Sequence, residues 1–509
     1  MRTKQAMKNV VTSFLLQIVL ALSGIIVPRF FIEVFGSSIN GLVSSINQFI
    51  TYMSLVEAGI GAAGTVALYP LIAEKNSKRI SEVVSAARNF YLHSGLFFLL
   101  LAVLLVISYP YVVDNEIQDI GFIRMMIAVL CINGIVDYFY LGKYRVLLVA
   151  DQRAYVLYSI QIIGTVIMTI VSVWTIQIGC SALAVKSVAA VIYLLRSLAV
   201  GVYVKSHYPD VDFHAEPDMQ SFGQRWAALL HQIAGMIVCN TDIVLLTLLV
   251  RINALVEVSV YSTYNLVACA LSNLMNSISN GLSAGFGDVI SRGERDTLER
   301  SFSSYEFVFF ILIFTAYSCM AVLLYPFIAL YSANFADHET YLRWALVALF
   351  TVAGLFQQLR LPGLTIICAA GHYKQTQWRA IMEAAINLGV SLILINRLGI
   401  CGVLIGTCAS YLYRTTDVII YTAKNFLPGT LRRSIVRILR NAAVSGAMTV
   451  GGLHLISRSV YSWGGWIINA VVFGILDIVV VIITNFLFER TEMVNAFMRF
   501  QEIAKNRGK

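Results

Sequence analysis

The sequence has few charged residues. Asp, Glu, Lys and Arg make up only 13% of its 509 residues, against about 25% in an average soluble protein. Hydrophobic residues make up 58%, and the mean hydropathy is +0.76. A soluble protein of this length needs a polar surface that so few charges cannot supply. The composition excludes a soluble enzyme, a nucleic-acid-binding protein and a disordered chain, and it predicts an all-α polytopic membrane protein.

Cysteine is also sparse. The eight cysteines lie in or beside apolar stretches and form no C-x-x-C pair, so they indicate packing residues rather than a disulfide scaffold or a metal site. The first apolar stretch is too long for the core of a signal peptide and has no A-x-A cleavage site, so we expect no cleavable signal peptide.

Long apolar stretches divide the chain into fourteen expected transmembrane helices, each with at least the ~20 residues that cross a bilayer. The expected spans are 10–33, 41–71, 89–112, 120–142, 154–177, 181–204, 225–249, 257–290, 304–330, 341–369, 377–396, 401–423, 436–456 and 465–488. Most of the 37 Lys and Arg residues fall in loops on one side, while the other side receives only Arg251, Arg343, Arg397 and Arg458. The positive-inside rule then places both termini in the cytoplasm.

Short sequence matches indicate an internal repeat. Tyr109-Pro110 matches Tyr325-Pro326, and the stretch 178–183 matches 398–403, with a nearly constant offset. Two copies of a six-helix unit are therefore expected: an N-lobe (1–204) and a C-lobe (225–423), joined by a cytoplasmic linker (205–224). Residues 424–509 add two helices and a cytoplasmic tail. We expect a monomer with its substrate site between the lobes.

Two glycine-rich stretches match sequence motifs of soluble enzymes. Residues 59–64 read G-x-G-x-x-G and residues 281–285 read G-x-S-x-G, but both lie inside apolar helical stretches, where neither a dinucleotide site nor a nucleophile elbow forms. Small residues instead favour close packing or a bend. Our hypothesis is that the second and eighth helices flex at five glycines: Gly59, Gly61, Gly64, Gly281 and Gly285.

Ionisable residues within the spans are the candidate functional residues, because a charge inside the membrane is costly. Five of them are assigned to a substrate cavity: Arg29, Glu57, Asp137, Arg360 and Arg414. Asp137 and Arg360 occupy nearby positions of the two repeats, so they could pair across a central cavity or line it separately.

A second set of polar residues has the oxygen-rich chemistry that a hard cation prefers. It contains Asp242, Glu383, Asn387 and Asp417. These residues could bind Na⁺, relay a proton, or form a buried polar cluster that locks the second lobe. Possible Na⁺ or H⁺ coupling is the only cofactor requirement expected, and no other metal site is predicted. Asp477 on the last helix is expected to be a packing or accessory-groove residue.

Several stretches together resemble a known family. They are Asn40-Gly41-Leu42, Leu55-Val56-Glu57-Ala58-Gly59-Ile60-Gly61, Leu68-Tyr69-Pro70-Leu71, Tyr109-Pro110 and Ala369-Ala370-Gly371-His372-Tyr373. They are similar to the bacterial polysaccharide (Wzx-type) flippases. That group belongs to the multidrug/oligosaccharidyl-lipid/polysaccharide (MOP) exporter superfamily, which also holds the MATE drug exporters and the lipid II flippases.

This resemblance implies a MATE-like fold and an alternating-access transporter rather than an enzyme. The implied substrate is an undecaprenyl-pyrophosphate-linked oligosaccharide, moved from the cytoplasmic to the outer leaflet of the bacterial cytoplasmic membrane. Membrane lipids, a polysaccharide polymerase and glycosyltransferases of the same pathway are the implied partners, and no nucleic acid is expected. The alternatives are a MATE-type multidrug/cation antiporter, whose members usually have twelve helices, and a lipid II flippase, whose members also have fourteen.

Overall fold

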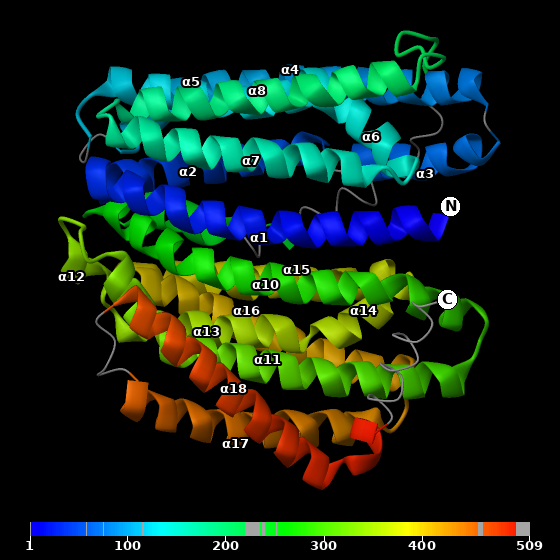
Figure 1. Cartoon of the computed structure of the whole chain (residues 1–509), viewed down its shortest axis with the longest axis vertical. Coiled ribbons are helices and arrows are strands. Elements are labelled where there is room, and N and C mark those ends of the chain that lie inside the picture. The colour runs from blue at the N-terminus through cyan, green and yellow to red at the C-terminus, as the bar shows by residue number, and fades with distance from the viewer. Residues whose placement is uncertain are drawn as a thin grey trace. The chain divides into compact units, whose positions relative to one another are not determined.

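A computed structural model describes residues 2–57, 59–74, 76–113, 117–218, 235–236, 240–250, 252–456 and 462–494. All regular structure in these ranges is helical. The chain forms two compact units, Met1–Leu266 and Val267–Lys509, and Figure 1 labels the helices of both. In the described ranges, ten helical segments are long and apolar enough to cross a membrane.

The first unit contains most of the N-terminal helices. They are α1 (Arg2–Phe35), α2 (Ser37–Met53), η1 (Ser54–Glu57), α3 (Ile60–Ala73), α4 (Ser77–Ser108), η2 (Tyr109–Tyr111), α5 (Ile120–Val136), the π-helical η3 (Asp137–Leu141), α6 (Gly142–Ala150), α7 (Ala154–Gln177) and α8 (Ala182–His207). Side-chain oxygens of Asn76, Asp119 and Ser181 accept hydrogen bonds from the first turns of α4, α5 and α8, which fixes where these helices begin.

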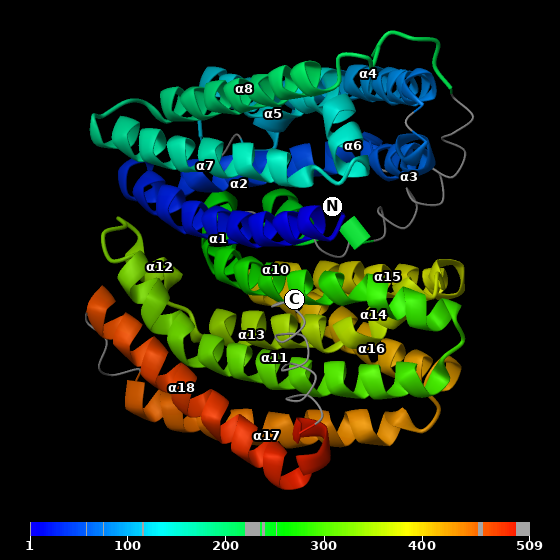
Figure 2. The ribbon, with the colours of Figure 1, turned by 45° about the vertical axis from the view of Figure 1, so that its right-hand side comes forward.

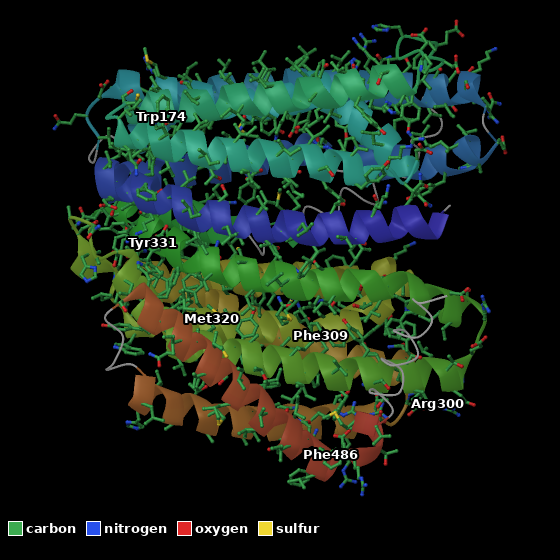
Figure 3. The ribbon with its side chains drawn as sticks, viewed as in Figure 1. Trp174, Arg300, Phe309, Met320, Tyr331 and Phe486 are labelled. Carbon is green, nitrogen blue, oxygen red and sulfur yellow. The ribbon has the colours of Figure 1, made fainter. Side chains whose placement is uncertain are left out.

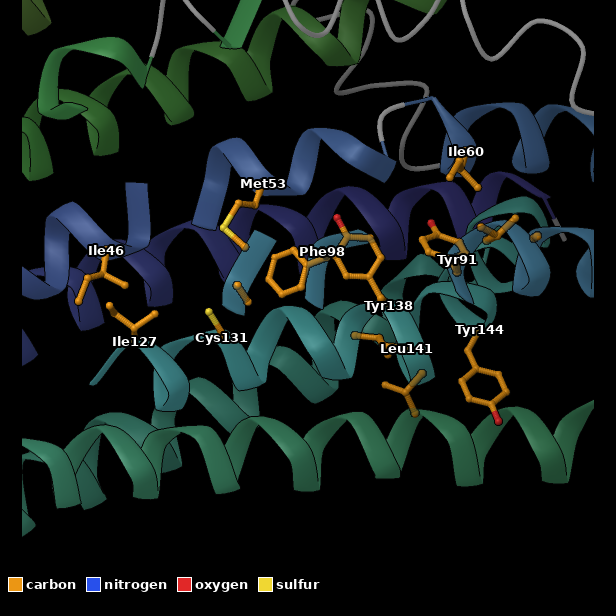
Figure 4. Close-up of a cluster of buried hydrophobic side chains, with 14 of the residues drawn as sticks. Ile46, Met53, Ile60, Tyr91, Phe98, Ile127, Cys131, Tyr138, Leu141 and Tyr144 are labelled. Atoms are coloured by element: carbon orange, nitrogen blue, oxygen red, sulfur yellow. The ribbon is translucent and has the colours of Figure 1, made fainter. Parts of the chain in front are cut away.

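The core of this unit is apolar and aromatic. Ile46, Phe98 and Ile127 are fully buried in it, and the buried Tyr91 and Tyr138 belong to the same cluster, with Tyr138 beside Phe98 (Figure 4). Burial of such side chains contributes about 1.5–3 kcal/mol each in water. In a membrane, packing between helices supplies more of the stability.

The second unit contains the C-terminal helices, and α10 (Ala254–Ser291) begins in the first unit and ends in the second. The others are α11 (Arg295–Tyr331), α12 (His338–Tyr341), α13 (Trp344–Leu359), α14 (Leu361–Ala369), α15 (Tyr373–Leu398), α16 (Ile400–Asn425), α17 (Thr430–Ile456) and α18 (Trp463–Phe488). In this unit α11 is the most enclosed helix: Phe309 and Tyr331 on it are buried, whereas Phe486 on α18 is exposed (Figure 3). Exposed apolar side chains are expected where lipid covers a helix.

Some expected spans differ from the helices observed. The span expected at 41–71 is divided into α2, η1 and α3, and the span expected at 341–369 is divided at Arg360. Hydropathy marks apolar residues but not the backbone interruptions among them. Of the span expected at 225–249, residues 225–234 and 237–239 lie outside the described residues, and Asn240–Leu249 is helical. The helices α16 and α17 are not among the ten most apolar segments, and each contains several charged residues.

Helix boundaries recur along the chain with the offset of the sequence matches. Corresponding helices begin at Ser77 and Arg295, at Ala154 and Tyr373, and at Ala182 and Ile400. The interruptions correspond as well, because the π-helical turn that begins at Asp137 and the break at Arg360 both divide the fourth helix of a predicted repeat. The linker expected at 205–224 includes the end of α8, and its described part is bonded to α4 through Ser81 and Ser85.

The closest helix pair in the second unit is α15 with α16. A tight turn at Gly399, with φ of +53°, connects them, and Gly402 and Gly406 form a G-x-x-x-G face on α16. A Cβ at Gly402 would lie 2.7 Å from the backbone carbonyl of Leu394, so only glycine permits this approach.

Gly402→Ala should therefore destabilise the protein, because the clash involves backbone atoms that cannot rotate away. We expect a loss of roughly 1–3 kcal/mol, as for other overpacked sites, measured as a lower midpoint of unfolding in detergent. Gly389→Ala on α15 is the matched control, because a Cβ there meets no atom within 4 Å. An equal effect of both substitutions would contradict the close-packing interpretation.

Candidate functional site

The first unit contains a cluster of charged side chains within its membrane helices. Arg145 on α6 lies 2.9 Å from the Asp137 carboxylate and 3.7 Å from that of Glu57. The Tyr193 hydroxyl on α8 donates a 2.6 Å hydrogen bond to the same Asp137 oxygen. The side chains of Arg145, Asp137 and Glu57 are 37%, 29% and 28% exposed, so the cluster borders an accessible space rather than a sealed core.

Two backbone irregularities position this cluster. Glu57 ends the short helix η1, and Asp137 begins the π-helical turn η3. Single π-helical turns occur frequently at functional sites. Long helical side chains lean toward the N-terminus of their helix, which directs Arg145 back along α6 toward Asp137. The cluster therefore depends on departures from regular α-helix that the sequence pattern does not reveal.

A cavity of about 370 Å³ adjoins the cluster. It contains two guanidinium groups, from Arg145 and Arg196, but only one carboxylate, from Asp137. Arg196 stacks over the Tyr193 ring, with its guanidinium carbon 4.1 Å from the ring centre. The polar lining is completed by neutral hydrogen-bonding side chains: Tyr158, Gln161, Tyr193 and Ser197. The cavity thus combines an excess of positive charge with neutral donors and acceptors, which suits an anionic group joined to a polar neutral one.

The second unit contains an alternating chain of charges. Arg360 pairs with Glu383, Arg414 lies 3.6 Å from Glu383 and 2.9 Å from Asp417, and Arg379 pairs with Asp417. The side chains of Arg414 and Glu383 are only 5% and 7% exposed. Three arginines and two carboxylates leave one excess positive charge. Arg360 itself lies at the break between α13 and α14 and is 4.8 Å above the Tyr411 ring.

Several of the expected site residues lie in ion pairs. Glu383 and Asp417, expected in a cation site, are paired with arginines, and two of these are the expected cavity residues Arg360 and Arg414. Carboxylates already neutralised by guanidinium groups attract a second cation weakly. Asp137 and Arg360 each have a partner within their own unit, Arg145 and Glu383, and pairing between the two stays a prediction.

The remaining polar candidates lie in separate environments. Asp242 accepts a 2.8 Å hydrogen bond from Tyr261 in the first unit. Asn387 on α15 donates hydrogen bonds to Thr407 and Ser410 of α16 in the second unit. Arg29 is partly exposed on α1. The described residues contain no group of three or more His, Cys, Asp or Glu side chains that could hold a metal ion.

The five glycines expected to be hinges fall into two classes. Gly59 has a left-handed backbone, with φ of +87°, and separates η1 from α3; Gly61 and Gly64 follow in α3. In contrast, Gly281 and Gly285 lie within the uninterrupted α10. The first stretch therefore contains a break in the helix and the second does not, and flexing at either position stays a prediction.

Arg145 and Arg379 were not expected in the site. The charge pattern assigns both to cytoplasmic loops, whereas the structure places Arg145 on α6 and Arg379 on α15, each paired with an expected site residue. The signal that could have identified Arg145 is its place in a helical segment, Ile120–Ala150, that continues from Asp137. Neutral Tyr193 and Gln161 carry no comparable signal, because uncharged polar residues are common in membrane helices.

Comparison with solved structures identifies the fold. A lipid II flippase MurJ in an inward closed conformation aligns with a TM-score of 0.64 at 14% identity, over 94% of this chain and 98% of MurJ. A multidrug resistance MATE family transporter of the MOP superfamily, inward-facing, aligns with a TM-score of 0.60 at 13% identity, over 83% of this chain and 99% of the transporter. This chain has a MATE-like fold. A further MATE structure, in complex with MaD5, aligns with a TM-score of 0.55 at 13% identity, over 84% of this chain and 96% of that one.

No family model and no curated protein matches the sequence. At identities this low, the similarity concerns the fold alone. Together with the ten apolar helical segments, the shared fold establishes a multi-pass membrane protein. Fold does not determine substrate, so the substrate has to be argued from the cavity.

Proposed function

We propose that the protein is a flippase for lipid-linked oligosaccharides. It moves undecaprenyl-pyrophosphate-linked repeat units of a polysaccharide from the cytoplasmic to the outer leaflet of a bacterial cytoplasmic membrane. Two pseudo-symmetric six-helix lobes expose the substrate alternately to the two sides, and two further helices complete the fourteen. In this proposal the protein acts as a monomer, carries out no chemical reaction, and serves glycosyltransferases and a polymerase of the same pathway.

The observation that carries this proposal is the composition of the first-unit cavity. Its volume, about 370 Å³, is within the roughly 300–1,000 Å³ that small-molecule sites occupy. Arginine recognises phosphate through two parallel hydrogen bonds, so Arg145 and Arg196 are suited to a pyrophosphate. Gln161, Ser197 and the tyrosines are suited to sugar hydroxyl groups. We assign this cavity to the head of the glycolipid, with Asp137 and Glu57 holding Arg145 in place.

The charge of the cavity fits a multidrug cation antiporter less well than the leading proposal, and it fits a lipid II flippase equally well. A multidrug cation antiporter needs a cavity that attracts positive charge, whereas this one contains two guanidinium groups and one carboxylate. A lipid II flippase carries the same kind of pyrophosphate, so the cavity does not separate it from the leading proposal. The sugar attached to the carrier lipid is what distinguishes them.

Depletion of the protein in its native cell tests the proposal. We expect undecaprenyl-pyrophosphate repeat units of one polysaccharide to accumulate on the cytoplasmic leaflet while lipid II continues to be exported. Labelling the sugars with a membrane-impermeant reagent, in inverted and in right-side-out vesicles, measures in which leaflet the glycolipid lies. Accumulation of lipid II instead would favour the second alternative, and loss of dye efflux with normal glycolipid export would favour the first.

A further inference from the structure

The third polar feature of the molecule lies outside both clusters, among α11, α17 and α18. Both views show α18 crossing α17 beside α11 (Figures 1 and 2). The buried face of α18 consists of four residues spaced one turn apart: Phe473, Asp477, Val481 and Asn485. Asp477 is completely buried, with 0% of its surface exposed, near the middle of a membrane-spanning helix.

The partners of Asp477 are insufficient for a buried carboxylate. It faces Ser318 and Cys319 of α11, but neither carboxylate oxygen has a hydrogen-bonding partner of normal geometry among the described residues. A charge in this position without compensation costs several kcal/mol. In the part of the chain that the structure describes, no arginine or lysine is paired with Asp477, although Arg437 and Arg440 form ion pairs elsewhere along the same three helices. Some other group must balance the carboxylate.

Neutral oxygen atoms lie beside Ser318, which faces Asp477. The Ser318 hydroxyl lies 3.1 Å from the Thr449 hydroxyl and 3.5 Å from the Ser445 carbonyl oxygen of α17. The hydroxyl groups of Ser445 and Thr315 are buried and have no partner among the described residues. Thr315 is one helical turn from Ser318 and therefore on the same face of α11.

Apolar side chains lie on both sides of these oxygen atoms along α18. On one side Phe473 packs with Val322 and Leu323, and on the other Val481 packs with Phe307 and Ile311. The oxygens therefore form an enclosed set, with one carboxylate and several hydroxyl and carbonyl groups, inside an otherwise apolar interface. Hard monovalent cations prefer such oxygen ligands.

We propose that α11, α17 and α18 form a sodium site centred on Asp477. The carboxylate supplies the compensating charge, and Ser318, Ser445 and Thr449 supply neutral oxygens. A proton would satisfy Asp477 alone, whereas a sodium ion also satisfies the unpartnered Ser445 hydroxyl. The inference goes beyond the proposed function, since Asp477, Ser445 and Thr449 lie on the two helices outside the predicted repeat and occupation of the site can be measured with no glycolipid present.

Equilibrium binding and thermal unfolding of the purified full-length protein in detergent test the site. Radiolabelled sodium should bind, and replacing choline chloride by NaCl at constant ionic strength should raise the unfolding midpoint by roughly 2–4 °C. KCl should raise it less. Asp477→Asn has nearly the same shape without the charge, so it should fold, lose this shift and lose the bound sodium. Ser318→Ala should retain the carboxylate and weaken sodium binding.

Asp288→Asn is the matched control. Asp288 is exposed and pairs with Arg292 on the surface, so its substitution should leave the sodium-dependent shift intact. The proposal is overturned if the wild-type midpoint does not distinguish Na⁺ from choline, as it would if Asp477 were simply protonated. It is equally overturned if Asp477→Asn keeps the full sodium shift, because the ion would then bind elsewhere. Either result leaves the glycolipid flippase proposal standing.

Discussion

Arg145→Gln should reduce glycolipid export by about 10- to 100-fold. A hydrogen bond to a charged group contributes roughly 1.5–3 kcal/mol, and each 1.4 kcal/mol is about tenfold in affinity. The substitution removes a cavity guanidinium and also leaves Asp137 and Glu57 without their cation, which removes the excess positive charge of the cavity. Arg145→Lys should recover only part of the activity, because an ammonium group cannot make the two parallel bonds of a guanidinium.

The matched control for this prediction is Arg124→Gln. Arg124 is on the same helical segment, Ile120–Ala150, but is exposed and outside the cavity. Export by membrane vesicles should be normal in this variant. Wild-type export by Arg145→Gln at equal protein abundance would show that the cavity does not bind the phosphate.

Arg437→Ala should produce the largest loss of stability. Arg437 on α17 has a side chain only 1% exposed and binds Glu306 at 3.0 Å, the Glu489 carboxylate and the Ser303 backbone carbonyl. Removing one partner of a buried ion pair leaves an uncompensated charge and typically costs about 3–5 kcal/mol. The expected result is a much lower unfolding midpoint in detergent, together with lower protein abundance in the membrane.

Two variants check the cause of that loss. Arg292→Ala removes an arginine from an exposed pair with Asp288, which should cost less than about 1 kcal/mol. Combining Arg437→Met with Glu306→Gln removes both charges of the most buried pair, while Glu489 keeps Arg440 at 2.9 Å, and should restore much of the stability. A double variant no more stable than Arg437→Ala would mean that packing, rather than charge, holds α17 against α11.

A lower pH should weaken the ion pair between Arg437 and Glu489. Glu489 lies just after α18, where burial raises its pKa but the hydrogen bond and charge of Arg437 outweigh that effect and leave the pKa lowered. A carboxyl group with a lowered pKa contributes stability that is present above its ordinary pKa and is lost as the pH falls through the lowered one. The acid-side loss of stability should therefore be smaller once Arg437 is replaced.

Much of the helical architecture is predictable from the sequence. The apolar stretches locate α5, α7, α8 and α18 within a few residues, because each must cover the bilayer thickness. The division of 41–71 at Glu57 and Gly59 is not visible in hydropathy, since the residues on both sides are equally apolar. The π-helical turn at Asp137 is likewise a backbone feature without a side-chain signature.

The sequence indicates which charged residues lie in the membrane helices, but not which of them form ion pairs. The rarity of charge in membrane helices singles out Glu57, Asp137, Arg360 and Glu383 from the sequence, and the structure shows that all four lie in ion-paired clusters. Which carboxylate meets which guanidinium depends on how helices distant in sequence pack. Arg145 and Asp477 show what charge counting leaves open: a basic residue assigned to topology lies in a charged cluster, and an acidic residue assigned to packing is buried at a helix interface.

The central claim is tested most directly with purified protein in liposomes. A short-chain polyprenyl-pyrophosphate oligosaccharide with a fluorescent label is placed in both leaflets, and its accessibility to an impermeant quencher is followed over time. The account predicts that wild-type protein equilibrates this lipid between leaflets, that Arg124→Gln does the same, and that Arg145→Gln is slower by at least about tenfold. Transport of a cationic dye without movement of the pyrophosphate lipid would contradict it.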